Sequence, residues 1–237
     1  MRKLLYILVL ATLILFLAQP SYASRKVQDC DKTQLSAINA QKYSLTWMTE
    51  LLVKDIKKAT PETGHLIKKW FGKNSVSFRK ELTTRLEVTH NLVSSSKAKC
   101  VTGSDVVNVY AYVLPSDPTK TINYAPLFFS APEVGRDSML GTVLHEFLHF
   151  DYPSHSIKGT DDVCIRDKSG KIVYDTTVKP KVCLKAYGVS AARNTAQNHP
   201  VNAQDNSDNF QFFLEDYADN LLPKKTNKRR LIWSILP

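Results

Sequence analysis

The sequence predicts a single α+β domain that is mainly helical and carries a small antiparallel sheet. Three observations lead to this class. Apolar residues recur at helical spacing over most of the chain, two central segments have the composition of strands, and no repeat or linker divides the chain. With 237 residues and 43% apolar content the chain can build one packed core, which excludes a disordered, collagen-like or disulfide-scaffold protein.

Residues 1–23 have the pattern of a secretory signal peptide. Arg2 and Lys3 precede an apolar stretch of about 15 residues, and small residues follow at Ser21 and Ala23, the two positions that a signal peptidase reads. The apolar stretch is shorter than the ~20 residues that span a bilayer. We therefore expect cleavage after Ala23, no stable membrane span afterwards, and a secreted or periplasmic protein.

The net charge of +10 raises the question of a nucleic-acid partner. Two basic residues belong to the leader, and five more cluster in residues 223–237. The part between them, residues 24–222, is only mildly basic. We therefore expect no nucleic-acid partner, and we interpret residues 223–237 as a solvated basic tail.

The N-terminal half is expected to contain three helices followed by two strands. Apolar residues at helical spacing predict helices over residues 34–57, 65–71 and 78–92. Residues 106–114 alternate and are rich in Val and Tyr, and residues 121–130 have a similar composition, so both are predicted strands.

The C-terminal half is organised around an apolar helix whose N-cap is Asp137 or Ser138. Residues 151–185 lack helical periodicity and contain several Gly and Pro residues, so they are expected to form a loop with room for one hairpin. Two last helices are expected near residues 185–197 and 207–221.

Four cysteines follow the predicted cleavage site: Cys30, Cys100, Cys164 and Cys183. An even number in an oxidising compartment indicates two disulfides, and four cysteines allow three connectivities. We favour Cys30–Cys100 and Cys164–Cys183, which join neighbours along the chain. A structural zinc site made of cysteines is not expected, because the C-x-x-C spacing is absent.

Residues 145–149 read His-Glu-Phe-Leu-His, which is the H-E-x-x-H pattern. On a helix the imidazoles of His145 and His149 point from one face toward one metal ion. Glu146 lies one residue round from that face, where it can hold a water without binding the metal. Zinc suits the site because it binds His nitrogen, has no redox chemistry and keeps an open position. We expect one Zn²⁺ per chain.

Spacing alone does not identify the third protein ligand of the zinc. His155 falls at the metzincin position, but Tyr152 stands where that motif has Gly, and no Met follows to form a Met-turn. Glu215 is the only Glu after Glu146 and could bind from a later helix. Asp162, in the sequence Gly-Thr-Asp-Asp, follows the helix after a short loop.

Together, H-E-x-x-H and the downstream Gly-Thr-Asp-Asp resemble the aspzincins, the family of deuterolysin and the fungal peptidyl-Lys metalloendopeptidases. The family signature pairs H-E-x-x-H with G-T-x-D-x-x-Y-G. Further similar stretches are Trp70-Phe71-Gly72, Gly135-Arg136-Asp137-Ser138, Asn206-Ser207-Asp208-Asn209 and Phe212-Phe213. The resemblance implies a zincin-type domain over residues 24–222 and a secreted zinc-dependent endopeptidase.

The resemblance also implies a role for each residue of the site. Asp162 is the third zinc ligand, Glu146 is the general base, and the Tyr187 hydroxyl stabilises the oxyanion. The family has two residues between the ligand Asp and Tyr-Gly, whereas residues 163–186 intervene here. This difference predicts an inserted loop closed by Cys164–Cys183, so that Asp162 and Tyr187 still lie close together.

A substrate preference follows from the same resemblance. Lys-specific members bind the residue after the scissile bond in an acidic pocket, and Asp208 matches one of its acids, while Gln211 stands at the other position. We expect a monomer that cleaves protein or peptide substrates, with a preference for Lys or another basic residue, and with the substrate extended along residues 121–130. The alternative is a non-catalytic extracytoplasmic binding protein that keeps a zincin-like fold.

Overall fold

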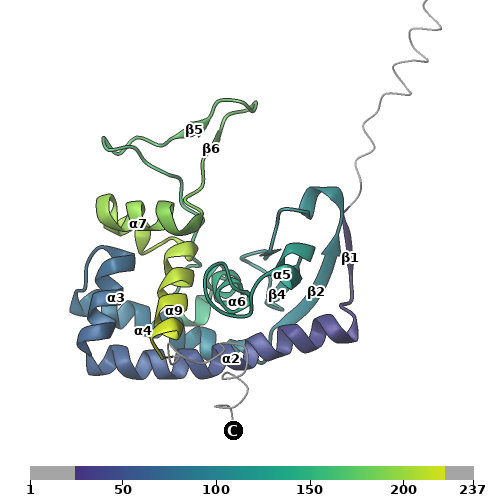
Figure 1. The fold of residues 1–237 in the computed structure, drawn as a ribbon, viewed down its shortest axis with the longest axis horizontal. Helices are drawn as coiled ribbons and strands as arrows, with labels where there is room; N and C mark the ends of the chain where they lie inside the picture. The colour runs from purple at the N-terminus through teal and green to yellow at the C-terminus, as the bar shows by residue number, and fades with distance from the viewer. Residues whose placement is uncertain (1–24, 222–237) are drawn as a thin grey trace, which may run out of the picture.

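The computed structural model describes residues 25–221, so the predicted leader and the predicted basic tail lie outside the described residues. Figure 1 shows the long helix α2 (Lys32–Lys58) along one side of the molecule, with a small sheet at one end and most of the other helices at the opposite end. Helix α6 (Met139–Leu148) lies between these two groups. None of the helices within residues 25–221 is both long and apolar enough to cross a bilayer.

The three expected N-terminal helices are present and extend slightly beyond their predicted limits. α2 begins with a capping box in which Asp31 accepts a hydrogen bond from the Gln34 backbone and Gln34 accepts one from the Asp31 backbone. α3 (Pro61–Phe71) starts with proline in its first turn and ends at Gly72, whose φ is +73°. α4 (Val76–Val93) packs along α2.

A mixed four-stranded sheet has the order β1-β2-β4-β3. Its strands are β1 (Lys26–Gln28), β2 (Lys97–Thr102), β3 (Ala111–Tyr112) and β4 (Thr121–Tyr124). The sequence predicts an antiparallel sheet, but β2 and β4 run parallel. β3 and β4 form an antiparallel pair in which β3 takes the outer position. β4 therefore lies next to β2 and runs in the same direction.

Both predicted strands are shorter than expected. Only Ala111–Tyr112 of residues 106–114 is a strand, because a 3₁₀ turn ends at Val106, residues 107–108 continue as a turn, and the expected alternate burial is absent. The predicted strand 121–130 ends at Tyr124, since Pro126 lacks an N–H for the ladder and begins the short helix α5 (Pro126–Ser130). β4 pairs with β2 on one side and with β3 on the other, so the expectation that it is the edge strand for substrate is wrong; the edge strands are β1 and β3.

Helix α6 is buried along its whole length. All ten of its residues are buried, and its neighbours are α2, α4, α5, β3 and α9 (Ser207–Leu221). Burial of each large apolar side chain stabilises the folded state by roughly 1.5–3 kcal/mol. A rotation of α6 about its axis would expose several of these side chains and would therefore be unfavourable. This packing fixes the direction in which its polar side chains point.

Glu215 of α9 anchors the first turn of α6. Its Oε1 accepts hydrogen bonds from the backbone N and the Oγ of Ser138, both at 3.0 Å, and Ser138 is the N-cap of α6. A Cβ at Gly141 would lie 2.2 Å from Glu215 Oε1, so this approach requires glycine. A carboxylate at a helix N-terminus interacts favourably with the helix dipole.

Residues 163–186 form a projecting segment, here called the arm, which contains β5 (Tyr174–Asp175) and β6 (Val182–Cys183). The sequence predicts a loop with one hairpin in this region. The last helices are α7 (Gly188–Asn198), α8 (Pro200–Ala203) and α9. Disulfides join Cys30 to Cys100 and Cys164 to Cys183, the two pairs that the sequence analysis favours.

A pH-dependent stability follows from the environment of Glu215. Burial raises the pKa of its carboxyl from 4.5 to about 7, against the Ser138 hydrogen bonds, which lower it. The folded state therefore holds this proton more tightly than the unfolded state, and stability falls as the pH rises from about 4.5 to about 7. Glu215→Gln should remove this fall, which amounts to roughly 3 kcal/mol at most.

Urea unfolding of both proteins across this pH range measures the effect. Glu133→Gln is the control, because Glu133 is exposed and the substitution should leave the pH profile unchanged. A stability difference between wild type and Glu215→Gln that does not vary with pH would contradict the assignment.

Candidate active site

His145, His149 and Asp162 converge beside α6. The Nε2 atoms of His145 and His149 lie 3.2 Å and 3.4 Å from Asp162 Oδ1, and the three ligand atoms lie within 4.8 Å of one another. Zinc binds nitrogen and oxygen at ~2.0–2.2 Å, so two ligands of a tetrahedral zinc are roughly 3.3–3.6 Å apart. The spacing and chemistry of these donors therefore fit a zinc ion.

Both imidazoles are oriented by contacts of the second ring nitrogen. His145 Nδ1 lies 3.0 Å from Asp208 Oδ1, and His149 Nδ1 lies 2.8 Å from the carbonyl oxygen of Thr160. An oxygen beside Nδ1, hydrogen-bonded in His149 and only in close contact in His145, favours a proton on that nitrogen and leaves Nε2 free to bind a metal. The tautomer of each ring therefore suits coordination through Nε2.

Asp162 reaches the histidines because the chain turns back closely against the end of α6. A Cβ at Gly159 would lie 2.1 Å from the carbonyl oxygen of His149, so only glycine permits this approach. The backbone of Asp161 then donates to Asp205 O at 2.9 Å and accepts from Ser207 N at 3.1 Å. These bonds hold the segment beside the start of α9 and present Asp162 to the two imidazoles.

Tyr187 follows the base of the arm and contacts the carboxylate oxygen of Asp162 that does not face the two histidines. The Tyr187 hydroxyl donates a hydrogen bond of 2.7 Å to Asp162 Oδ2, although the two residues are 25 positions apart. Lys185 Nζ donates to the Asp162 carbonyl oxygen at 2.7 Å, and Ala186 N donates to Val163 O at 2.8 Å. The arm is thus a closed insertion whose two ends meet at the site.

Charges within the site favour a cation between these groups. Burial lowers the pKa of His145, but the hydrogen bonds to Asp162 and Asp208 raise it to about 10. Burial also opposes ionisation of Asp162, yet the two imidazoles hold its pKa well below the usual range. Burial raises the pKa of Glu146. The negative charges of Asp162 and Asp208 that hold a proton on His145 would also stabilise a metal cation bound at the same place.

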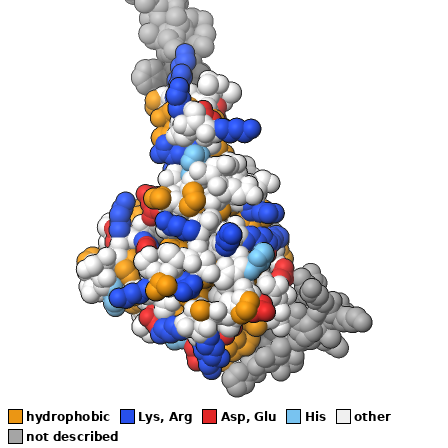
Figure 2. All heavy atoms as spheres, turned by 90° about the vertical axis from the view of Figure 1, so that its left-hand side faces the viewer, with side chains coloured by type: hydrophobic (Ala, Val, Ile, Leu, Met, Phe, Trp, Pro, Cys, Tyr) orange, Lys and Arg blue, Asp and Glu red, His pale blue; other side chains and the backbone are white. Residues whose placement is uncertain are grey.

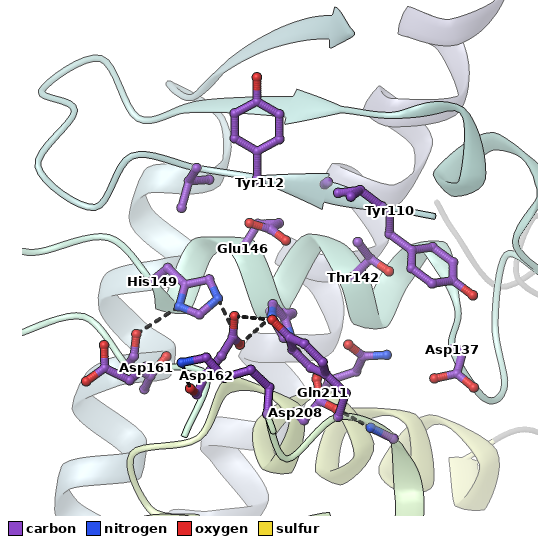
Figure 3. Close-up of a pocket in the computed structure, with 18 of the residues that line it drawn as sticks. Tyr110, Tyr112, Asp137, Thr142, Glu146, His149, Asp161, Asp162, Asp208 and Gln211 are labelled. Carbon is purple, nitrogen blue, oxygen red and sulfur yellow. Dashed lines mark hydrogen bonds and ion pairs between the residues drawn. The ribbon is translucent and has the colours of Figure 1, made fainter. Parts of the chain in front are cut away.

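A cavity of about 670 Å³ opens beside the three donors. Figure 3 shows Tyr112 on one side of Glu146 and His149, and Asp162 and Asp208 on the other. Glu146 lines this cavity, and its Oε2 has no hydrogen-bond partner among residues 25–221. The site therefore offers a metal-binding face, a buried carboxyl group and room for a substrate.

The two other candidate ligands lie elsewhere. His155 is exposed in a 3₁₀ turn, where its Nδ1 is 3.0 Å from Ser154 Oγ. Glu215 accepts hydrogen bonds from Ser138, at the end of α6 opposite His149. Neither residue belongs to the group formed by the two histidines and Asp162.

Asp208 has a contact that the sequence does not predict. It is 5% exposed, its Oδ1 faces His145, and its Oδ2 accepts a 2.6 Å hydrogen bond from Gly188 N. Gln211 lines the cavity and donates to Glu215 at 3.2 Å. Local sequence carries no signal for the contact of Asp208 with His145, because the two residues are distant along the chain, and the contact of the Thr160 carbonyl with His149 depends on the path of the loop between them.

A family model described as lysine-specific metallo-endopeptidase, the aspzincin family, matches residues 56–180. The chain belongs to the aspzincin family. A peptidyl-Lys metalloendopeptidase of Pleurotus ostreatus is 30% identical over 151 residues, which are 62% of this chain and 71% of that protein. An extracellular protease of Aeromonas hydrophila is 27% identical over 153 residues, which are 65% of this chain. This aspzincin chain spans only 36% of the Aeromonas protein.

The fold of this aspzincin is similar to a solved structure of the family. A zinc peptidase from Grifola frondosa superimposes with a TM-score of 0.61 at 25% identity, covering 80% of this chain and 98% of that one. The predicted α+β, zincin-type class is therefore confirmed.

The contact between Asp208 and His145 predicts a loss of zinc affinity in Asp208→Ala. Removal of an acceptor behind a ligating histidine weakens metal binding about 10–100-fold. Asp161→Ala is the matched control, because its carboxylate is close to the site but 64% exposed. Competition with a chromogenic chelator measures both affinities. Equal losses in the two variants, or no loss in Asp208→Ala, would overturn the positioning role.

Proposed function

We propose that this aspzincin is a zinc-dependent endopeptidase that hydrolyses peptide bonds in proteins or peptides. The observation that carries the proposal is the buried Glu146 carboxyl on the wall of an open cavity, beside two histidines and an aspartate with the spacing of zinc ligands. His145, His149 and Asp162 would hold one zinc ion per chain. Membership of the aspzincin family supports the same activity.

Glu146 is the proposed general base. When bound, zinc supplies Lewis-acid polarisation of the scissile carbonyl and lowers the pKa of a water molecule. Glu146 takes a proton from the attacking water and later delivers it to the leaving amine. Burial raises the pKa of Glu146 above its ordinary value, which makes the carboxylate a stronger base toward the attacking water.

Tyr187 is the proposed donor to the oxygen of the scissile carbonyl as negative charge develops there. Burial and the hydrogen bond to Asp162 raise the pKa of Tyr187 above its usual range, so its hydroxyl keeps its proton at neutral pH. The side chain lies at the rim of the cavity and is 56% exposed, so it can turn from Asp162 toward a bound substrate.

The substrate is proposed to lie along β3. This strand is an edge of the sheet, and residues 108–113 line the cavity, so an extended peptide can pair with it. Asp137 and Asp208 line the same cavity and favour a basic residue after the scissile bond. Because Gln211 supplies no charge, we propose that both Lys and Arg are accepted there. The name of the Pleurotus relative supports the preference for Lys.

The protein is further proposed to act outside the cytoplasm as a monomer, with a leader over residues 1–23, a peptidase domain over residues 24–222 and a basic tail over residues 223–237. Two disulfides and the relationship to an extracellular protease of Aeromonas hydrophila support the location.

Glu146→Gln tests the proposed activity. The variant should keep its zinc, because Glu146 is not among the proposed ligands, and should lose casein hydrolysis by about 10²–10⁴-fold. Asp162→Ala should lose zinc, whereas His155→Ala should keep it. Zinc content by atomic absorption and casein cleavage are measured on the same samples. Unchanged cleavage by Glu146→Gln would contradict the role of Glu146 as general base, and no cleavage by the zinc-loaded wild type would leave a binding protein.

The proposed preference is tested with peptides that differ only in the residue after the scissile bond. Wild type should cleave the Lys and Arg peptides faster than the Ala peptide, and the Glu peptide most slowly. Asp137→Asn should reduce the advantage of Lys over Ala about tenfold, as expected for a lost charge-assisted hydrogen bond. Asp161→Asn is the control. An unchanged ratio of kcat/KM in Asp137→Asn would contradict this role of Asp137.

A further inference from the structure

The arm, residues 163–186, is a separate structural unit on the rim of the site. Its three short stretches are joined where Ile165 N donates to Leu184 O at 2.8 Å, Val173 N to Ile165 O at 2.9 Å, and Leu184 N to Val173 O at 2.9 Å. Figure 1 shows this unit projecting from the helices with two tips. Such a small sheet is marginally stable alone, and Cys164–Cys183 ties its base together.

The two tips of the arm have different surroundings. The turn at residues 167–171 lies near the end of α7, where Asp167 O is 3.2 Å from His199 Nε2. The other tip, residues 176–181, extends to the opposite side in Figure 1 and is exposed at every residue. Lys185 and Tyr187, at the base of the arm, line the cavity. A polypeptide bound in the cavity therefore has the arm beside it.

The arm carries a concentrated positive charge, with six basic residues and two acidic ones. Both acids are used by local turns. Asp167 Oδ1 accepts from the backbone of Ser169 at 2.8 Å, and Asp175 Oδ1 accepts from the backbone of Thr177 at 2.8 Å. Neither acid forms an ion pair with a basic side chain of the arm, and six basic residues against two acidic ones leave the arm with a net charge of +4.

Four lysines of the arm are exposed and form no ion pair with any residue between 25 and 221: Lys168, Lys171, Lys179 and Lys181. Figure 2 shows Lys and Arg side chains at the end and along the sides of the projecting part, with hydrophobic side chains between them. Tyr174 and Val182 are both about half exposed, at 48% and 53%. The surface thus combines positive charge with apolar contacts.

We propose that the arm is a docking surface for acidic protein substrates. A segment rich in Asp and Glu would bind the four lysines while a neighbouring segment of the same chain occupies the cavity. This inference rests on the proposed endopeptidase function. A polypeptide is the favoured partner because the base of the arm is continuous with the cavity, and because exposed Tyr174 and Val182 suit apolar side chains next to the acids.

Two matched variants and two peptides test the docking surface. The arm variant replaces Lys168, Lys171, Lys179 and Lys181 with Gln. The control replaces Lys54, Lys58, Lys73 and Lys80 with Gln, since these lysines are also exposed and lie outside the arm. The peptides share one cleavable sequence, and one of them carries an added run of Asp and Glu residues.

Wild type and the control should cleave the acidic peptide with a KM about tenfold lower at low salt, and added salt should abolish this advantage. The arm variant should lose the advantage while cleaving the neutral peptide normally, which also shows that it is folded. The proposal would be overturned if the arm and control variants showed the same preference for the acidic peptide. It would also be overturned if the arm variant lost the same fraction of its activity on both peptides.

A binding measurement separates this proposal from the proposed catalysis. Fluorescence anisotropy follows the acidic peptide on Glu146→Gln, with and without the arm substitutions. Binding that disappears with the arm lysines supports the docking surface even where no cleavage is observed. Unchanged binding of the acidic peptide, together with loss of binding to phosphatidylglycerol vesicles or duplex DNA, would overturn the assignment to acidic proteins.

Discussion

The contact of Asp162 with the imidazoles of His145 and His149 is the constraint on which the rest of the site depends. A carboxylate withdrawn from water costs several kcal/mol unless nearby groups compensate for its charge. Here the two Nε2 atoms face one carboxylate oxygen, and the Tyr187 hydroxyl donates to the other. Asp208 and the Thr160 carbonyl complete the arrangement by orienting the imidazoles. The same charges that stabilise Asp162 make the site suitable for a cation.

Helix α9 holds the active-site helix at both ends. Glu215 accepts from Ser138 at the start of α6, and Asp208 contacts His145 near its end. α9 is itself fixed to α3, because Asp216 accepts from Trp70 Nε1 at 2.7 Å. The donors are therefore carried by packed helices rather than by loops, which favours precise geometry. Asp162 is the exception, and its loop is held by Gly159 and by backbone bonds to the segment before α9.

Much of the fold could be predicted from sequence because its signals are local. Helical spacing predicted the long helices, and the i, i+4 spacing of His145 and His149 predicted that the two imidazoles share one face, the proposed metal-binding face. β2 was missed, since its residues do not alternate and only Cys100 and Val101 are buried. Spacing alone does not identify the third zinc ligand, because His155, Glu215 and Asp162 are all possible. The family resemblance is what favours Asp162. The pairing of Asp208 with His145 depends on how α9 packs on α6, and no local pattern encodes it.

The proposed catalysis requires that His145, His149 and Asp162 bind one zinc ion. The most direct measurement is anomalous diffraction from crystals of the zinc-loaded protein, recorded on both sides of the zinc absorption edge. The account predicts a single peak at ~2.0–2.2 Å from the two Nε2 atoms and from the Asp162 carboxylate. A peak beside Glu215 or His155, or no peak among these side chains, would contradict it.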